Sequence, residues 1–443
     1  MKRLYIQTHG CQMNQYDSDR IARVMSRHGY APTDRAEDAD LILLNTCSVR
    51  DKAEQKVYSA LGRWRELKEK NRNVVIGVGG CVAQQEGQNL LRRVPYLDLV
   101  FGTHNIHKLA GMVQEAESRT NRPVEIAFYR DPSYMEEPEA KSAVHGAKAY
   151  VTIMQGCNKV CSFCIVPYVR GRELSRPSEK IVQEIEALIA RGVKEVMLLG
   201  QNVNSYGKNS PGELSFPELL ARINAVAGLE RIRFTTSHPQ DLSPELIEAY
   251  ATLDKLCEHL HLPVQSGSDS VLRRMRRGYT REEYLDRIRR LRGRCPGVAL
   301  GTDIIVGFPG ETEQEFAGTL EILQEVEYDD IYAFSYSPRP HTLAGRIYAD
   351  DVAEDVKKER LEKVLRLQQE IARRKNGTMA GKIEEVLVDG AAKLARGQMM
   401  GRTRTNRIVN FMGPQDLSGT LARVRIIAAG ANSLLGELIT AQQ

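Results

Sequence analysis

The stretch QGCNKVCSFC, residues 155–164, places three cysteines in the spacing Cys-x3-Cys-x2-Cys on a loop that follows a predicted strand. At these intervals Cys157, Cys161 and Cys164 can wrap their thiolates around one face of a 4Fe–4S cluster. Three ligands leave the fourth iron open for a substrate, as catalytic metal sites keep one position free. A zinc site is the alternative. Structural zinc normally takes four ligands, and the nearest upstream candidate for a fourth is His145.

The region that begins with this loop alternates predicted strands and helices six times. The predicted strands centre near Val151, Met197, Arg233, His261, Ile304 and Tyr332. The first helix has Pro177 near its start, one apolar face, and Gly192 after its end. Six units are fewer than the eight of a closed barrel, so we expect a partial (β/α) barrel. A charged amphipathic helix over about 351–375 completes this domain, 148–375.

An α/β domain with a parallel sheet is predicted over residues 1–120. Apolar runs near residues 4–6, 41–44 and 74–78 have the length of buried strands, and helical patterns separate them. This alternation is typical of a parallel sheet flanked by helices. Residues 121–147 lack any periodicity and are predicted to be a linker to the central domain.

Three further cysteines, Cys11, Cys47 and Cys81, each follow one of these apolar runs directly. Because the carboxyl ends of parallel strands meet at one edge of a sheet, we expect the three thiols to converge. They would hold a second three-ligand cluster. Each cysteine taken singly has the alternative of being a small buried apolar residue. That is our interpretation of Cys257 and Cys295, which have no such context.

The last part of the chain, residues 376–443, changes to short β-rich pieces separated by glycines. These pieces are residues 383–388, 407–411, 424–428 and 434–439. They predict a small β-barrel of a kind that often binds nucleic acid. Residues 371–443 contain 11 Lys/Arg against 5 Asp/Glu, which suggests a polyanionic partner. A solvated surface of mixed charge is the alternative.

The composition is that of a multidomain protein without a membrane segment. At 443 residues the chain exceeds what one hydrophobic core usually holds, so two or three domains are expected. No stretch approaches the ~20 apolar residues of a membrane helix, and the first residues lack the apolar core of an export signal. We therefore expect a cytoplasmic protein. The eight cysteines are too few for a secreted disulfide scaffold, and their grouping favours metal or redox chemistry.

The three-cysteine loop resembles that of the radical S-adenosylmethionine (radical-SAM) enzymes. The resemblance implies that S-adenosylmethionine chelates the open iron and is cleaved by one electron to a 5′-deoxyadenosyl radical. It also implies contacts to this cofactor from Phe163, from Gly200 and Gln201 after the second strand, from Gln265 and Ser266 after the fourth, and from Val306 in the fifth. Each of these positions has an ordinary strand-to-loop turn as its alternative.

Nearly the whole chain resembles the methylthiotransferases of the MiaB type, which act on tRNA and end in a TRAM domain. The motifs that carry the likeness are residues 10–14, 155–172, 199–206, 261–268 and 401–407. The resemblance implies an α/β cluster domain, a partial barrel and a TRAM barrel. It implies conversion of N6-isopentenyladenosine beside the anticodon to its 2-methylthio form, with two 4Fe–4S clusters, the auxiliary one carrying the sulfur. An electron donor such as a flavodoxin-like protein is expected.

The resemblance gives the basic residues a role in binding the anticodon stem-loop. We expect Arg402, Arg404 and Arg407 to hold phosphates and Phe411 to stack on a base. Arg404 is a departure, because an acidic residue is expected near this position in the family. Further basic groups are Arg170 with Arg172 and the run 273–277. A solvated helix face is the alternative for the run, and the target base must leave its stack to reach the barrel.

Three other functions remain open. One sister methylthiotransferase modifies an aspartate of a ribosomal protein, and another acts on threonylcarbamoyl-adenosine of tRNA. The basic tail argues against the first, and the loop 263–268 argues against both. A non-catalytic iron–sulfur RNA-binding sensor would need fourth cluster ligands, which six cysteines divided three and three do not supply.

Overall fold

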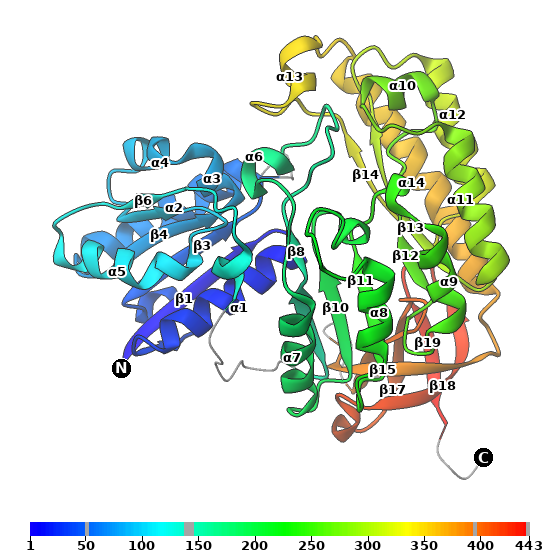
Figure 1. Cartoon of the computed structure of the whole chain (residues 1–443), viewed down its shortest axis with the longest axis horizontal. Helices are drawn as coiled ribbons and strands as arrows, with labels where there is room; N and C mark the ends of the chain where they lie inside the picture. The colour runs from blue at the N-terminus through cyan, green and yellow to red at the C-terminus, as the bar shows by residue number, and fades with distance from the viewer. Residues whose placement is uncertain (49–52, 137–145, 393–396, 440–443) are drawn as a thin grey trace.

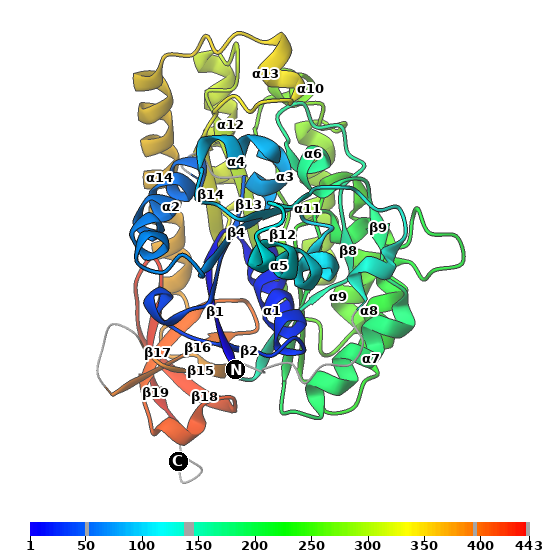
Figure 2. The same ribbon diagram turned by 90° about the vertical axis from the view of Figure 1, so that its left-hand side faces the viewer.

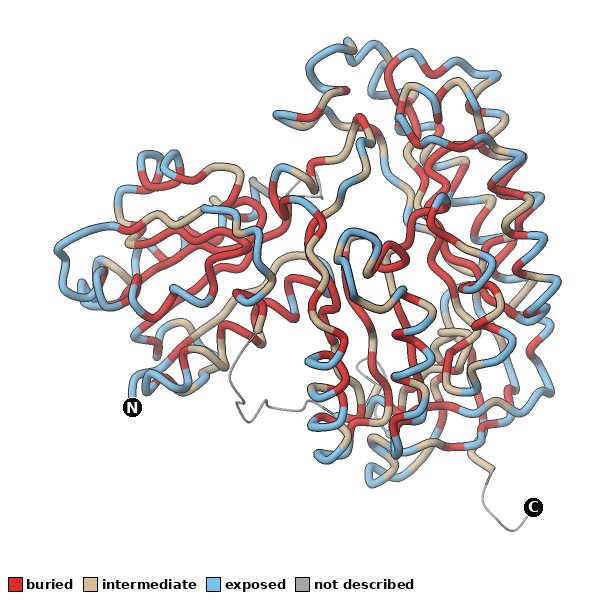
Figure 3. Tube along the Cα trace, viewed as in Figure 1, coloured by how far each residue is buried: buried red, intermediate tan, exposed pale blue. Residues whose placement is uncertain are grey.

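The computed structural model describes residues 1–48, 53–136, 146–392 and 397–439, which form three domains (Figure 1). An N-terminal α/β domain and a C-terminal β-barrel both contact a central half-open barrel of strands and helices. Buried residues follow the strands and the inward helix faces of each domain (Figure 3). The predicted mixed α/β class is therefore confirmed. His145 lies outside the described residues.

The N-terminal domain is built on a six-stranded parallel sheet in the order β2-β1-β3-β4-β5-β6. Its strands are β1 (Lys2–His9), β2 (Tyr30–Pro32), β3 (Leu41–Thr46), β4 (Val75–Gly80), β5 (Leu99–Phe101) and β6 (Val124–Glu125). The predicted runs are β1, β3 and β4. The other three strands are only two or three residues long, too short to show a period of two. Because β6 pairs with β5, the sheet extends into the predicted linker 121–147.

Helices cover both faces of this sheet. They are α1 (Gln12–Ser26), α2 (Ala53–Lys70), α3 (Cys81–Glu86), α4 (Gln88–Arg93) and α5 (Leu109–Ser118). Every residue of β3 is buried: Leu41 and Leu43 belong to the core with α1 and α5, while Ile42 and Leu44 belong to the core with α2. A strand covered on both faces explains the unbroken apolar run in the sequence.

The central domain carries all six predicted strands. They are β7 (Lys148–Thr152), β10 (Glu195–Leu199), β11 (Arg231–Thr235), β12 (His259–His261), β13 (Ala299–Val306) and β14 (Asp330–Ser335). They form two parallel sheets, β11-β10-β7 and β12-β13-β14, which adjoin through a bridge between Ile232 and Leu256. Since β7 and β14 do not pair, the barrel is partial, as predicted.

The outer wall of the partial barrel consists of helices (Figures 1 and 2). They are α7 (Ser178–Ile189), α8 (Phe216–Asn224), α9 (Pro244–Thr252), α11 (Arg281–Arg294), α12 (Glu313–Val326) and α14 (Glu354–Gly377). Alternation along β10 sends Val196 and Leu198 into the core beneath these helices, while Met197 packs on the opposite face. The short elements β8 (Met154–Gln155), α6 (Val166–Arg170), β9 (Leu174–Ser175), α10 (Asp269–Arg274) and α13 (Leu343–Ile347) surround the cysteine loop.

The C-terminal domain is a closed five-stranded barrel in the order β15-β16-β17-β19-β18. Its strands are β15 (Ile383–Ala391), β16 (Gln398–Thr403), β17 (Ile408–Met412), β18 (Leu421–Ala429) and β19 (Leu434–Leu438). The predicted barrel is confirmed, but β16 is absent from the predicted pieces because Gly397 and Gly401 resemble turn residues. In β16, the Gly401 position lies against β15, where a Cβ would meet the Leu387 carbonyl oxygen at 2.4 Å.

Phe411 requires a correction. Its side chain is fully buried in the core of the C-terminal barrel, with Val386, Val409 and Val424, so it has no face to offer a base. The next residue, Met412, is 63% exposed. The alternation of β17 therefore directs the aromatic ring inward.

No helix among the described residues combines the length and the apolar character that crossing a bilayer requires.

We expect Phe411→Ala to destabilise the C-terminal barrel by about 3–5 kcal/mol, because it empties a core position. Met412→Ala, one residue along the same strand, is the matched control and should change stability by less than about 0.5 kcal/mol. Hydrogen exchange of the amides of β15–β19 measures both. Reduced RNA affinity of Phe411→Ala with unchanged exchange protection would instead support base stacking.

Two candidate cysteine sites

The structure brings Cys11, Cys47 and Cys81 together at the carboxyl edge of the N-terminal sheet. Cys11 lies between β1 and α1, Cys47 follows β3, and Cys81 begins α3 after β4. A hydrogen bond between the Cys11 and Cys47 side chains lowers the pKa of Cys11 to about 6. Burial raises the pKa of Cys81. Cys11 is exposed, whereas the other two are buried, so the trio opens on the Cys11 side.

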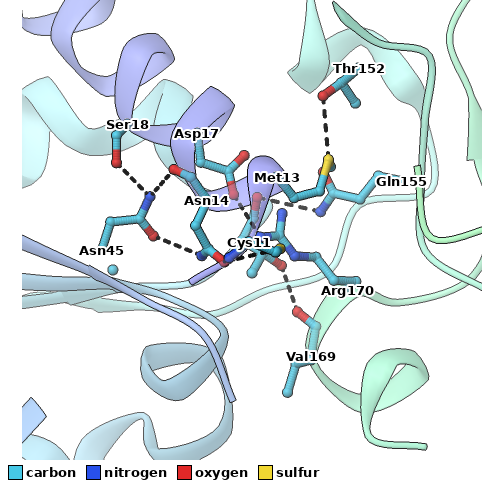
Figure 4. A network of polar contacts seen from close by, with 12 residues as sticks. Cys11, Met13, Asn14, Asp17, Ser18, Asn45, Thr152, Gln155, Val169 and Arg170 are labelled. Carbon is cyan, nitrogen blue, oxygen red and sulfur yellow. Dashed lines mark hydrogen bonds and ion pairs between the residues drawn. The ribbon is translucent and has the colours of Figure 1, made fainter. Parts of the chain in front are cut away.

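A buried network of amides holds the loops of Cys11 and Cys47 together (Figure 4). Asn14 Oδ1 accepts from the Cys11 backbone N–H at 3.4 Å, and Asn14 Nδ2 donates to the Thr46 carbonyl at 3.1 Å. Asn45 Nδ2 donates back to the Asn14 carbonyl at 2.8 Å. Gly80 has φ +89°, and a Cβ there would lie 2.4 Å from the Thr46 carbonyl oxygen. The loops of Cys47 and Cys81 approach closely only because this position is glycine.

The second trio stands on the loop between β8 and α6. Cys157, Cys161 and Cys164 are all half-buried, and burial raises the pKa of Cys157 and of Cys164 to about 12. Arg277 donates from Nη1 to Cys161 Sγ at 3.3 Å and from Nη2 to the Pro263 carbonyl at 2.7 Å. A buried guanidinium thus stands beside one thiol of this trio.

The loop is attached to the barrel at two points. Ser162 N–H donates to the Met275 carbonyl at 2.9 Å, and its hydroxyl donates to the Arg274 carbonyl at 2.7 Å. Gly156 N–H donates to Gln201 Oε1 at 2.5 Å. Gly156 has φ +85°, and a Cβ there would lie 2.0 Å from the Arg172 carbonyl oxygen, so only glycine fits at the start of the loop.

Neither trio is arranged for a single metal ion. Over the described ranges of the chain, no three His, Cys, Asp or Glu side chains are grouped closely enough to hold one ion. A 4Fe–4S cluster spreads its thiolate ligands over several irons, so a wider trio fits it. Three cysteine ligands at each site agree with a cluster that keeps one iron open, whereas structural zinc takes four ligands.

One short segment connects the two sites. Helix α6 follows the second trio directly, and its last residue, Arg170, makes a buried 2.7 Å ion pair with Asp17 of α1. The Thr103 hydroxyl donates to the Val169 carbonyl at 2.7 Å, and His104 Nε2 lies 2.9 Å from the Arg170 carbonyl. Burial lowers the pKa of His104 to about 4, so the ring is neutral in this contact at pH 7.

Of the predicted contacts to S-adenosylmethionine, three lie near the cysteine loop. Phe163 and Ile305 both pack against the apolar cluster that contains Phe308, beyond the carboxyl end of β13. Gln201 holds the start of the loop, as described above. Gln265 has φ +75° and a buried Oε1 atom that no described residue pairs with, so it is available to a ligand.

Of the other three predicted contacts to S-adenosylmethionine, those of Val306 and Ser266 need correction, and Gly200 has a packing role in the fold. Val306 belongs to the core under the helices, so its side chain does not face the barrel interior. Ile305, the neighbouring residue on the opposite face of β13, does. The Ser266 hydroxyl, fully buried, accepts from the Ser268 N–H at 3.2 Å, so it serves the local turn. A Cβ at Gly200 would lie 2.6 Å from the Met154 side chain, which gives this glycine a packing role.

The arginines of the 401–407 motif join the C-terminal barrel to the central domain. Arg404 makes an ion pair with Glu258 at 2.8 Å and donates to the Leu256 carbonyl. Arg407 pairs with Asp329 at 2.5 Å. The expectation that these two side chains hold phosphates is therefore corrected: their guanidinium groups are paired within the protein. Among its contacts with described residues, the Arg402 side chain donates only across its own turn, to the carbonyl oxygen and Oδ1 of Asn406, both at 3.2 Å.

Three of the remaining basic candidates are also committed to the fold, whereas Arg273 and Arg276 of the run 273–277 are exposed. Arg170 and Arg277 are buried, as described above, and Arg274 pairs with Glu315 at 3.1 Å. Burial and pairing of these side chains were hidden in the sequence, where a run of arginines looks the same on either face of a helix. Arg172 is exposed.

A cavity of about 500 Å³ lies where the three domains meet. Its wall includes Gln12 and Tyr16 of α1, Tyr150 and Met197 of the partial barrel, and Arg402 of the C-terminal barrel. Gln12 follows Cys11 in the sequence, and Arg402 belongs to the C-terminal barrel, so the cavity wall runs from the start of α1 to that barrel.

Comparison with family models divides the chain into the same three parts. Residues 3–102 match an uncharacterized protein family, UPF0004, residues 151–323 match the radical SAM superfamily, and residues 377–439 match the TRAM domain. Among solved structures, the chain is similar to a radical S-adenosylmethionine methyltransferase, TsrM, from Kitasatospora setae. The TM-score is 0.58 and the identity 13%, over 90% of this chain and 79% of that chain. At this identity the likeness concerns the fold.

The chain is also similar over its full length to proteins named tRNA-2-methylthio-N(6)-dimethylallyladenosine synthase. The protein of Geobacter sulfurreducens is 53% identical over 440 residues, which are 99% of this chain and 98% of the relative. That of Geobacter metallireducens is 53% identical over 442 residues, 100% and 99% of the two chains. That of Clostridium botulinum (strain Okra / Type B1) is 48% identical over 437 residues, 98% and 96%.

We expect Arg404→Ala and Glu258→Gln to loosen the docking of the C-terminal barrel, because each breaks a partly buried ion pair. In a double-mutant cycle the two should show a coupling of about 1 kcal/mol, measured by hydrogen exchange of β15 and β16. The exposed Arg423→Ala is the control and should leave exchange unchanged. If Arg404→Ala lost RNA affinity without any change in hydrogen exchange, the original expectation that Arg404 binds phosphate would be supported instead.

Proposed function

Because this chain belongs to the tRNA-2-methylthio-N(6)-dimethylallyladenosine synthases, we propose that it adds a methylthio group to N6-isopentenyladenosine beside the anticodon of tRNA. It is a radical-SAM methylthiotransferase that uses two 4Fe–4S clusters and S-adenosylmethionine. One observation carries the proposal. Two trios of thiols stand in adjoining domains, each beside one buried arginine, and the segment 156–172 joins them.

The two trios have different roles in this proposal. Cys157, Cys161 and Cys164 hold the cluster that binds S-adenosylmethionine, and Cys11, Cys47 and Cys81 hold the auxiliary cluster. When bound, these groups supply the methyl group, the sulfur and the radical chemistry of the reaction. The protein contributes thiolate ligands, two buried cations that offset the negative charge of thiolate-ligated clusters, and a fixed relation between the sites.

Residues at the mouth of the partial barrel orient S-adenosylmethionine. The unpaired Gln265 Oε1 is a hydrogen-bond acceptor for the amino groups of the cofactor, and Phe163 offers an apolar face to its adenine. Gln201 keeps the cysteine loop in place through Gly156 N–H. The buried Gln265 and the apolar ring of Phe163 limit the access of water to the reacting centre, which protects a radical from quenching.

The substrate base reaches the centre through the cavity between the three domains. The C-terminal barrel contacts the amino ends of β7, β11 and β14, whereas the cysteine loop lies at the carboxyl ends. RNA on that barrel must therefore extend along the open side of the partial barrel, where Arg402 and Tyr150 line the cavity. A flipped base can enter there and approach Cys11.

The partners outside the chain follow from this chemistry. The anticodon stem-loop of tRNA is the substrate, which supports a cytoplasmic location. Reduction of the radical-SAM cluster requires a single-electron donor, and a flavodoxin-like protein of low potential meets that need.

Reconstituted protein should contain about eight irons per chain, as two 4Fe–4S clusters require. Replacing all three of Cys11, Cys47 and Cys81 by Ala should leave about four, and so should replacing Cys157, Cys161 and Cys164. Cys295→Ala, outside both trios, is the control and should retain about eight. Iron and sulfide analysis measures all four proteins. About four irons in the unmodified chain would contradict the two-cluster proposal.

Substitutions in the two cysteine trios should affect different steps of the reaction. Cys161→Ala should abolish cleavage of S-adenosylmethionine, because the cofactor loses the cluster that reduces it. Cys47→Ala should still cleave the cofactor but form no methylthio product, because only the auxiliary site is damaged. Chromatography of 5′-deoxyadenosine and mass spectrometry of tRNA nucleosides measure the two outcomes. Equal loss of cleavage in both variants is incompatible with this division.

The substrate is tested in cells that lack the gene. Their tRNA should contain N6-isopentenyladenosine without its 2-methylthio form, and the wild-type gene should restore the modified nucleoside. Restoration of a methylthio group on threonylcarbamoyl-adenosine, or on a ribosomal-protein aspartate, would identify one of the sister activities instead.

A further inference from the structure

Arg170 belongs to the central domain, but its side chain is buried against the N-terminal domain. Its residue exposure is 3%, and its Nη2 atom donates to Asp17 Oδ2 of α1 at 2.7 Å. Within the described part of the chain, its Nη1 atom has no hydrogen-bond partner. A buried guanidinium with an unused donor is costly unless something accepts from it.

The thiols of the auxiliary trio are what Arg170 faces. Cys81 packs directly against Ile165 and Val169 of the segment that ends in Arg170. Figure 4 shows Arg170 beside Cys11, and the positive charge of Arg170 acts to lower the pKa of both Cys81 and Cys11. Asp17 is the one carboxylate that pairs with Arg170 among the described residues. The cation is therefore enclosed between one carboxylate and two thiols.

The backbone around Arg170 is held as firmly as its side chain. Its carbonyl and that of Val169 accept from the 103–104 segment of the N-terminal domain, as described above. Arg170 is six positions after Cys164, so the same short segment carries ligands of one cluster and the cation of the other site. The first trio is thus built by one domain and completed by the next.

We propose that Arg170 is a positioning residue of the auxiliary cluster: held by Asp17, it directs a buried positive charge and a hydrogen-bond donor at the sulfur atoms of that cluster. The proposal rests on the function proposed above. It assigns Arg170 a role other than RNA binding, and it makes the auxiliary site complete only when the two domains are docked. Charge and hydrogen bonds near the sulfurs are among the factors that set the reduction potential of an iron–sulfur cluster.

The test uses the full chain with Cys157, Cys161 and Cys164 replaced by Ala, so that only the auxiliary cluster remains. In this parent, Arg170→Gln should shift the midpoint potential of the cluster to more negative values, because a nearby positive charge is lost. Asp17→Asn should shift it in the opposite direction, because a nearby negative charge is lost and the cation stays. Arg170→Lys keeps the charge and should remain closer to the parent. Potentiometry followed by electron paramagnetic resonance measures each shift.

The exposed Arg172→Gln, two residues away, is the matched control and should leave the potential unchanged. Shifts of the same sign in Arg170→Gln and Asp17→Asn, or no shift in Arg170→Gln, would overturn the proposal, because a merely structural role predicts no opposition of sign. If Arg170→Gln fails to hold a cluster, Arg170→Lys must still hold one; loss in both variants also overturns it. A parent that never holds a cluster would contradict the proposed function rather than the role of Arg170.

Discussion

The packing of α6 against the N-terminal domain is the contact on which the rest of this structure depends. The Arg170–Asp17 ion pair is buried, so the two domains cannot separate or slide without exposing or orphaning a charge. Breaking a buried pair of this kind by removing one partner costs about 3–5 kcal/mol. Because α6 also follows the second cysteine trio in the chain, this one contact sets the position of both candidate clusters relative to each other.

The C-terminal barrel is attached at the other end of the partial barrel by arginines of each domain that bind groups of the other. Arg231 and Arg233 of β11 donate to the carbonyls of Arg402, Thr403 and Arg404, while Arg404 itself pairs with Glu258 of the central domain. This mutual arrangement uses the positive charge that gives the tail its basic composition. The net positive charge of the tail therefore overstates the charge available to bind RNA, because part of that charge is paired at the interface between domains. The cavity shared by the three domains is a consequence of both attachments.

Some elements could be predicted from local pattern and others could not. The six strands of the partial barrel have apolar residues with the period of a strand, and the structure has strands at each of these places. The two-residue β6 and the glycine-containing β16 are too short or too irregular to show a period, and they form because neighbouring strands offer hydrogen bonds. Val306 and Phe411 illustrate another limit. Strand alternation indicates that one face is buried, but the choice of face is made by the surrounding helices or by barrel closure.

The sequence by itself determined which residues can hold clusters, because ligand chemistry is a property of residue type and spacing. Cys157, Cys161 and Cys164 share one loop, and Cys11, Cys47 and Cys81 share one edge of a parallel sheet, so both groupings follow from local order. The tertiary structure alone decided what the charged residues do. Arg170, Arg277 and Arg404 differ in their roles only through distant partners, Asp17, Cys161 and Glu258, that folding brings beside them. Pairing of buried charges depends on contacts between residues far apart in the chain, and no local pattern encodes it.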